Sequence, residues 1–173
     1  MAFLAIENAS SSSSSIPPSS TPGCKYDVFL SFRGPDTRNN FTDHLCYRLK
    51  QEGIFTFRDN ERLEQGTKID SGLLRAIDES KIAVVVLSKQ YASSSWCLIE
   101  LAKIVDCMDK KKLTVLPVFH YVDPSDVRNQ RGSFAKAFAK HENRFKDKID
   151  DVKTRRAALI EVANLSGWHL EDK

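Results

Sequence analysis

The fold is decided by the segment KIAVVVLS at residues 81–88, which is almost entirely apolar. A second segment of the same kind, LTVLPVFHYV, lies at residues 113–122. Strands that are buried on both faces have nearly continuous apolar runs, whereas strands with one solvated face alternate between apolar and polar residues. The two segments therefore predict strands inside a parallel sheet.

Shorter apolar runs and helical patterns surround these two segments. The runs at 25–32 and 54–59 predict two further strands, and residues 167–170 predict a fifth. Helical patterns occupy five ranges: 39–51, 69–79, 96–109, 133–145 and 152–165. Because alternating strands and helices require crossover connections, we expect an α/β protein in which helices cover both faces of a five-stranded parallel sheet.

Composition excludes several classes of protein. The hydrophobic fraction of 41% and the charged fraction of 28% are those of a globular domain with one buried core. The net charge of +3 is too small to indicate a nucleic-acid-binding face. No apolar run approaches the roughly 18 residues that a membrane span needs. The cysteines form no zinc-type pattern, so we expect no metal and reduced thiols in the cytoplasm or nucleus: Cys24, Cys46, Cys97 and Cys107.

The first 23 residues differ from the rest of the chain. They contain an unbroken serine run at 10–15, three prolines, and a single charged residue, Glu7. They lack the arginines of a transit peptide, and the apolar start MAFLAI is too short for the core of a signal peptide. We therefore expect a disordered leader at 1–23 and one folded domain at 24–173.

In an open parallel sheet, ligands bind beyond the carboxyl ends of the strands. The segment SSSWCLIEL, residues 93–101, follows the third predicted strand, and Glu100 lies in its helical part. On a helical wheel Glu100 falls outside the apolar stripe, so an ion pair with Lys103 would explain it as a surface charge. A capping box does not explain it, because the required Ser or Thr is replaced by Cys97. The alternative is a working carboxylate.

Two other segments lie at the same end of the sheet. RGPDTR, residues 33–38, predicts a turn at Gly34 and Pro35 and then a helix whose free N–H groups face a ligand. Its two arginines would bind phosphate oxygens, or else the segment is a plain loop with two solvated arginines. The polar loop at 59–69 contains Gly66 and is long enough to act as a lid or a partner-binding surface.

Two kinds of site find no support in the sequence. His44 and His120 have no Ser or Cys nucleophile at a recognisable spacing, which argues against a hydrolase triad. A phosphorylatable receiver domain needs acidic residues at the ends of the first and third strands. Here Asp27 lies inside the first strand, and Ser88 ends the third.

Four segments together resemble the successive motifs of a TIR (Toll/interleukin receptor) domain, of the kind found in plant TIR nucleotide-binding leucine-rich-repeat immune receptors. They are YDVFLSFRGPDTRNNFTDHL, FRDNERLEQG, LLRAIDESKIAVVVLSKQYASSSWCLIEL and VLPVFHYVDPSDVRNQRGSF. The resemblance runs from about Lys25 to the end, with order and spacing intact, and implies a flavodoxin-like fold. The family has one more helix after the fifth strand, so the resemblance also implies a fragment of a longer receptor or a short-form protein.

The resemblance implies an enzyme that cleaves NAD+, or NADP+, between nicotinamide and ribose without a cofactor. The family's catalytic glutamate corresponds to Glu100. Its substrate pocket corresponds to these residues: Arg33, Gly34, Pro35, Asp36, Thr37, Arg38, Gly66 and Trp96. Trp96 suits a core anchor at the start of the helix equally well.

A single carboxylate is compatible with this reaction. Hydrolysis of an O-glycoside normally needs two carboxyl groups, one of which protonates a poor leaving group. Nicotinamide leaves NAD+ as a neutral molecule, so one carboxylate that stabilises the positive charge developing on the ribose is enough.

The resemblance further implies signalling in defence and cell death through weak contacts between copies of the domain, and with other TIR proteins. Asp43 and His44 lie on the first helix, where the family often has a Ser–His pair, and Trp168 lies in a second surface at 167–169. The alternative function is a non-catalytic module that signals through homotypic contacts alone.

Overall fold

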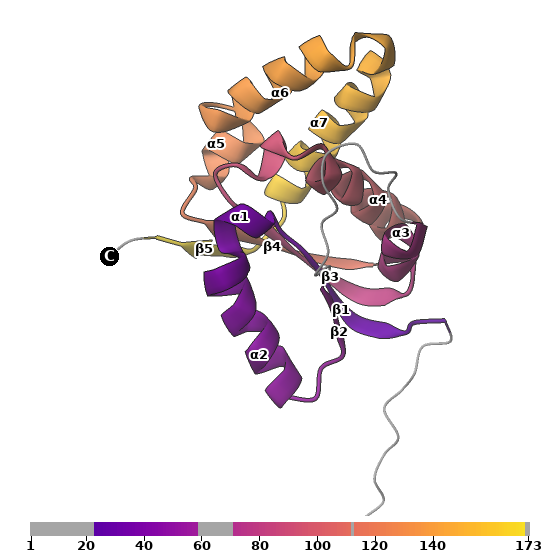
Figure 1. Ribbon diagram of the computed structural model, residues 1–173. Coiled ribbons are helices and arrows are strands. Elements are labelled where there is room, and N and C mark those ends of the chain that lie inside the picture. Colours follow the sequence, from indigo (N-terminus) through magenta and orange to yellow (C-terminus); the bar gives the residue numbers. More distant parts are fainter. Residues whose placement is uncertain (1–22, 59–70, 112, 172–173) are drawn as a thin grey trace, which may run out of the picture.

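The computed structural model describes residues 23–58, 71–111 and 113–171, which form a sheet between two helical layers (Figure 1). The predicted leader, apart from Gly23, and the loop that contains Gly66 lie outside these residues. The sheet has five strands: β1 (Tyr26–Ser31), β2 (Thr56–Arg58), β3 (Ser80–Leu87), β4 (Thr114–His120) and β5 (Trp168–Leu170).

All neighbouring strands are parallel, in the order β2-β1-β3-β4-β5. This is the flavodoxin-like order, and it confirms the predicted fold class. β3 is the central strand, and Val85, Val86 and Leu87 are fully buried, as its apolar sequence predicts. The strand order reverses between β1 and β3, and open α/β sheets bind ligands at the carboxyl ends of the strands at such a switch point.

Seven α-helices follow one another along the described residues. They are α1 (Gly34–Thr37), α2 (Asp43–Gln51), α3 (Ser71–Asp78), α4 (Ser95–Lys111), α5 (Pro124–Arg128), α6 (Ser133–Arg144) and α7 (Ile149–Ala163). The helix predicted at 39–51 is divided, because a π-helical turn at Arg38–Thr42 joins α1 to α2. Asp123 caps α5: its Oδ1 accepts a hydrogen bond of 2.7 Å from the backbone N–H of Ser125. Within the described residues, none of the helices is long and apolar enough to cross a membrane.

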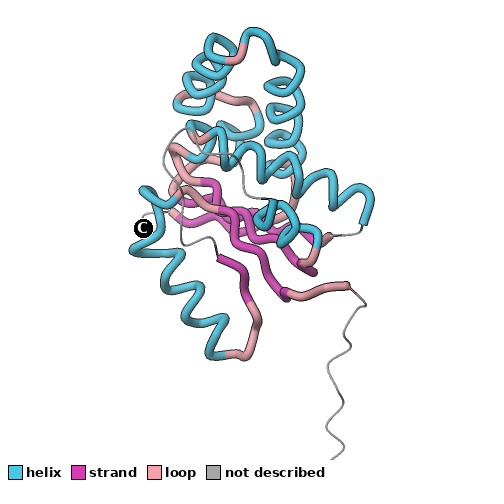
Figure 2. The backbone as a smooth tube through the Cα atoms, turned by 45° about the vertical axis from the view of Figure 1, so that its right-hand side comes forward, coloured by secondary structure: helices cyan, strands magenta, loops and turns pink. Residues whose placement is uncertain are grey.

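The two faces of the sheet are covered unequally (Figure 2). Among the described residues, α2 and the π-helical turn before it cover one face, over a small cluster that contains Val28, Leu30 and Phe32 of β1 and its end. α3, α4, α6 and α7 lie on the other face, where the larger core includes Phe29. α2 itself has no fully buried residue. β1 therefore sends alternate side chains into two different layers.

The backbone just before β5 lies in close contact with the backbone of β4. A Cβ atom at Gly167 would lie 2.2 Å from the carbonyl oxygen of Pro117 in β4, so only glycine fits there. This contact leads directly into β5, where Val118 and Trp168 are paired.

We expect Gly167→Ala to lower the free energy of unfolding by about 1–3 kcal/mol, since the new methyl group forces β5 away from β4. Chemical denaturation measures this change. Ser166→Ala, at the exposed neighbouring position, is the control and should change stability little. Equal stabilities of Gly167→Ala and the wild type would show that the contact is not tight.

Asp78 fastens α3 to α4. Its Oδ1 lies 3.0 Å from Lys103 Nζ and 2.8 Å from Lys111 Nζ, and it accepts a hydrogen bond of 3.2 Å from the thiol of Cys107. Burial opposes the charge on Asp78, but the hydrogen bonds from Lys111, Lys103 and Cys107 outweigh it and lower the pKa of Asp78 to about 2. The same burial, with the Asp78 carboxylate beside it, raises the pKa of Cys107 to about 11, so this thiol is unreactive.

The lowered pKa of Asp78 predicts how stability changes with pH. The folded state favours the charged carboxylate, so its contribution is complete above about pH 4 and is lost as the pH falls towards 2. Asp78→Asn should lower stability at neutral pH and flatten the stability curve between these two values. Asp106→Asn, which removes the exposed pair of Asp106 with Lys110, is the control with a smaller effect. A curve for Asp78→Asn that runs parallel to that of the wild type would contradict the assignment.

Candidate functional site

Asp36 joins the loops that follow β1 and β3. Its Oδ1 accepts a hydrogen bond of 2.5 Å from Arg33 Nη1. Its Oδ2 accepts one of 2.5 Å from Ser88 Oγ and one of 3.2 Å from the backbone N–H of Gln90. The carboxylate therefore ties the segment after β1 to the segment after β3 at the switch point.

The segment after β1 differs from the prediction in where its helix begins. A turn was expected at Gly34 and Pro35, but α1 starts at Gly34. The backbone N–H groups of Asp36 and Thr37 both donate to the carbonyl oxygen of Arg33, at 3.1 and 3.3 Å. The first turn of α1 therefore uses both of these N–H groups, and the contact of this segment with a ligand stays a prediction.

The two arginines of this segment are half-buried. Arg33 forms the ion pair with Asp36. The guanidinium of Arg38 lies over the ring of Phe32, with its Cζ 5.4 Å from the ring centroid. It also lies beside Gly34, where a Cβ would approach Arg38 Nε to 3.1 Å. Gly34 therefore leaves room for Arg38 to lie flat along the loop.

Thr37 and His120 complete the described part of this edge. Thr37 is buried and accepts a hydrogen bond of 2.8 Å from the hydroxyl of Thr42. His120, at the end of β4, lies 5.5 Å from Phe41 between ring centroids. Burial lowers the pKa of His120, and the nearby Asp36 carboxylate acts in the opposite direction. His120, isolated in the sequence, is thus brought close to Asp36 by the fold.

Glu100 is buried, with 2% of its surface exposed. Its Oε2 accepts a hydrogen bond of 2.8 Å from the hydroxyl of Ser31 at the end of β1. The same Ser31 oxygen lies 2.8 Å from the hydroxyl of Tyr91, in the 3-10 turn at Tyr91–Ser93. The carboxylate therefore lies at the carboxyl edge of the sheet, beside the switch point.

The expectation that Glu100 is a surface charge paired with Lys103 is wrong. Lys103 pairs with Asp78 instead. The helical wheel failed because α4 also buries side chains that were not counted in its apolar stripe: Cys97, Glu100 and Cys107. The first two of these face the end of β1, where the thiol of Cys97 donates to the carbonyl oxygen of Phe32 at 3.6 Å.

The start of α4 follows the sequence prediction more closely. The hydroxyl of Ser94 accepts a hydrogen bond of 3.3 Å from the backbone N–H of Cys97 and so caps the helix. Trp96 is half-buried and packs against the larger core, which suits the anchor interpretation. Its contact with a substrate stays a prediction, and so does that of Gly66, which lies outside the described residues.

Sequence reasoning missed Ser31, Ser88 and Tyr91. Ser31 offered a signal, because it is a polar residue in an apolar strand and two positions after Phe29, so it faces the same layer. A buried hydroxyl in such a place needs a hydrogen-bond partner. Nothing in the local sequence identifies that partner as Glu100, which lies 69 residues away.

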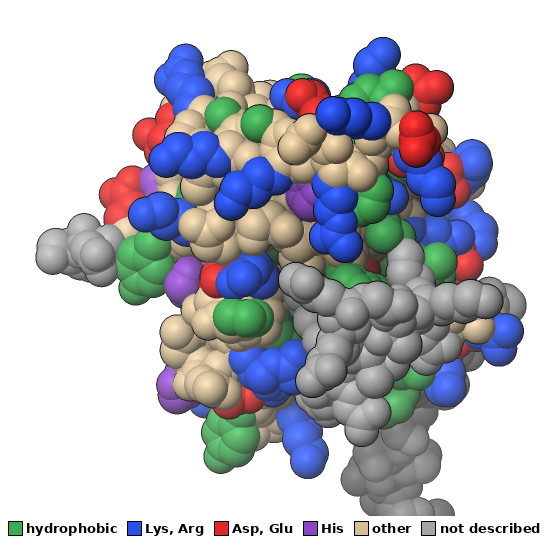
Figure 3. Space-filling model, turned by 45° about the horizontal axis from the view of Figure 1, so that its top comes forward, with side chains coloured by type: hydrophobic (Ala, Val, Ile, Leu, Met, Phe, Trp, Pro, Cys, Tyr) green, Lys and Arg blue, Asp and Glu red, His purple; other side chains and the backbone are tan. Residues whose placement is uncertain are grey.

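The residues predicted for self-association lie on the surface. Asp43 and His44 are exposed on α2, and Asp43 also pairs with Arg58 of β2 at 2.5 Å. Trp168 on β5 is 59% exposed. On the face shown in Figure 3, Lys and Arg side chains are interspersed with Asp and Glu. Contacts between copies of the chain stay a prediction.

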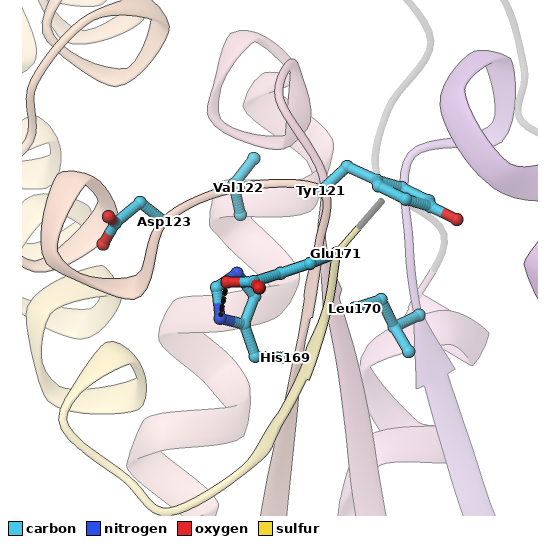
Figure 4. A pocket seen from close by; sticks show the side chains of 6 residues that line it. All are labelled: Tyr121, Val122, Asp123, His169, Leu170 and Glu171. Carbon is cyan, nitrogen blue, oxygen red and sulfur yellow. Dashed lines mark ion pairs between the residues drawn. The ribbon is translucent and has the colours of Figure 1, made fainter. Parts of the chain in front are cut away.

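A separate hollow of about 260 Å³ lies at the carboxyl ends of β4 and β5 (Figure 4). Its lining consists of Tyr121, Val122, Asp123, His169, Leu170 and Glu171. His169 Nδ1 lies 3.0 Å from Glu171 Oε1, and Asp123 points away from this pair. The hollow includes neither Glu100 nor the loops after β1 and β3. Within the described ranges, no group of three or more His, Cys, Asp and Glu side chains is arranged to hold a metal ion.

Comparison with known proteins gives consistent matches. The family model of the TIR domain matches residues 25–173. The chain is 54% identical over 149 residues to TMV resistance protein N of Nicotiana glutinosa, a match that covers 86% of this chain and 13% of that protein. It is 55% identical over 150 residues to disease resistance protein RUN1 of Vitis rotundifolia, which covers 85% of this chain and 11% of that protein.

A solved structure is similar over most of the chain. It is the structure of the activated Roq1 resistosome directly recognizing the pathogen effector XopQ, in its TIR domains. The match has 53% identity and a TM-score of 0.76, and it covers 84% of this chain and 87% of that chain. The chain spans only 13% and 11% of the length of the two curated relatives.

Proposed function

The chain belongs to the TIR-domain family, and we propose that it cleaves NAD+ at the bond between nicotinamide and ribose, with Glu100 as the catalytic residue. The observation that carries this proposal is the position of Glu100. It is a buried carboxylate at the carboxyl edge of the sheet, beside the point where the strand order reverses. Ligands of open α/β sheets bind at that point.

The chemistry needs one negative charge in a place from which water is excluded. As nicotinamide departs, positive charge develops on the ribose, and a carboxylate in a low-dielectric environment stabilises that charge more strongly than one in water. Water then attacks to give ADP-ribose, or the adenine ring attacks to give a cyclic product. Because only 2% of Glu100 is exposed, productive binding has to displace part of what covers it.

The predicted substrate residues would surround this carboxylate. Asp36 holds the segments after β1 and β3 together, and Arg38 provides a positive charge beside them. NADP+ is the alternative substrate. We propose that Gly66 and Trp96 also contact the substrate.

The biological role that we propose is defence signalling by self-association. The curated relatives are named as resistance proteins, and the similar solved structure is of an assembly. Asp43, His44 and Trp168 are exposed and available for contacts with further copies or with other TIR proteins. We place the chain in the cytoplasm, the nucleus or both.

The second candidate function is a non-catalytic interaction module. The hydrogen bond from Ser31 favours this second function, because it gives the Glu100 carboxylate a structural partner inside the fold. In that case Glu100 would only join β1 to α4, and its replacement would affect stability alone.

We expect Glu100→Gln to lower the rate of nicotinamide release by on the order of 100-fold or more, because the amide keeps the shape but not the charge. Glutamine suits the test better than alanine, since the side chain is buried and its loss would leave a cavity. Nicotinamide release and thermal melts are measured together at high protein concentration.

Lys103→Ala is the matched control on the same helix. It breaks the pair with Asp78 and leaves Glu100 in place, so most activity should remain. If Glu100→Gln releases nicotinamide at the wild-type rate, the carboxylate is structural and the interaction module is the better function.

Self-association should be weak, because exposed polar surfaces such as that around Asp43 and His44 rarely form stable interfaces. We expect a monomer in dilute solution, and activity per molecule that rises with concentration. Analytical ultracentrifugation of Trp168→Ala should show reduced association. Phe55→Ala, which removes another aromatic side chain of similar exposure, is the control. An oligomer whose size is independent of concentration would contradict this expectation.

A further inference from the structure

The hydroxyl groups of Ser31 and Tyr91 form a hydrogen-bonded chain that ends at the Glu100 carboxylate. Resting on the proposed function, we propose that Ser31 and Tyr91 are positioning residues: Ser31 holds the Glu100 carboxylate, and Tyr91 holds Ser31. Neither residue was singled out by the sequence motifs.

The chain is buried throughout. Ser31 and Tyr91 are both fully buried, and Glu100 is nearly so. Ser31 Oγ lies 2.8 Å from Glu100 Oε2 and 2.8 Å from the Tyr91 hydroxyl, which in turn lies 3.1 Å from the carbonyl oxygen of Cys97. The three side chains come from β1, from the turn after β3, and from α4.

Counting protons gives the direction of the hydrogen bonds. An ionised carboxylate only accepts, so the single proton of Ser31 points to Glu100. The oxygen of Ser31 is then an acceptor for the Tyr91 hydroxyl, whose single proton it shares with the carbonyl oxygen of Cys97 as second acceptor. Both donors point towards the carboxylate, and each strengthens the next because linked hydrogen bonds polarise one another.

The fold fixes both hydroxyl groups from outside the site. The side-chain alternation of β1 aims Ser31 at α4, on the same side as Phe29. The segment that carries Tyr91 is held by α6 at two points. The hydroxyl of Ser133 donates to the carbonyl oxygen of Lys89 at 2.7 Å, and His141 Nε2 lies 2.7 Å from that of Ala92.

A fixed carboxylate matters to the reaction because charge stabilisation depends on its distance from the ribose. A displacement of about 1 Å can cost on the order of 100-fold in rate. A buried carboxylate also needs hydrogen bonds to remain charged. Ser31 meets both needs, and Tyr91 acts through it.

The test compares the kinetics of nicotinamide release by Ser31→Ala, Tyr91→Phe and the wild type. We expect Ser31→Ala to lower kcat by about 10- to 100-fold with KM unchanged, as loss of an orienting partner does elsewhere. Tyr91→Phe keeps the ring and should lower kcat by less. Ser31→Cys, which restores a weak donor of similar size, should recover part of the loss.

Ser80→Ala is the matched control. Ser80 is also buried, and its hydroxyl donates to the carbonyl oxygen of Ala76 at 2.6 Å, but it lies at the opposite end of the sheet from Glu100. It should lower the melting temperature without changing kcat. Equal losses of kcat in Ser80→Ala and Ser31→Ala would overturn the inference, since the effect would then be one of general stability.

Two further outcomes separate this inference from the proposed function. If Ser31→Ala is as active as the wild type while Glu100→Gln is inactive, the positioning role is overturned and the proposed function stands. If Glu100→Gln is as active as the wild type, the proposed function falls and the inference with it.

Discussion

The two-residue period of β1 is the constraint on which the rest of the molecule depends. Val28, Leu30 and Phe32 face α2, while Phe29 and Ser31 face the layer that contains α4. A shift of one residue in the pairing of β1 would exchange these two sets. It would turn Ser31 towards α2 and break its hydrogen bond to Glu100, so the candidate site depends on the register of β1.

The candidate site is built from contacts that each join distant parts of the chain. Asp36 binds Ser88 across 52 residues of sequence, and Ser31 binds Glu100 across 69. The first contact closes the loops over the switch point, and the second anchors the start of α4 to β1. A carboxylate is used in both cases, that of Asp36 partly exposed and that of Glu100 buried.

Local patterns in the sequence predicted all five strands, and the structure places each within the expected range or one residue from it. The same reasoning missed the burial of Glu100, because a helical wheel assumes one buried side. α4 has two, since the end of β1 covers Cys97 and Glu100 from a second direction. Ser31 and Tyr91 were missed for a related reason. Their hydrogen-bond partners lie 60 or more residues away in the sequence, and local sequence patterns do not indicate such contacts.

Because the two faces of the sheet are covered unequally, we expect the helices to differ in how easily they unfold locally. α2 packs only partly buried side chains on a small cluster, whereas α4 contributes many to the large core. Detaching α2 exposes little apolar surface, so it costs much less free energy than global unfolding. Its backbone amides should therefore exchange with solvent deuterium through local openings, while those of α4 and β3 remain protected until the whole domain unfolds.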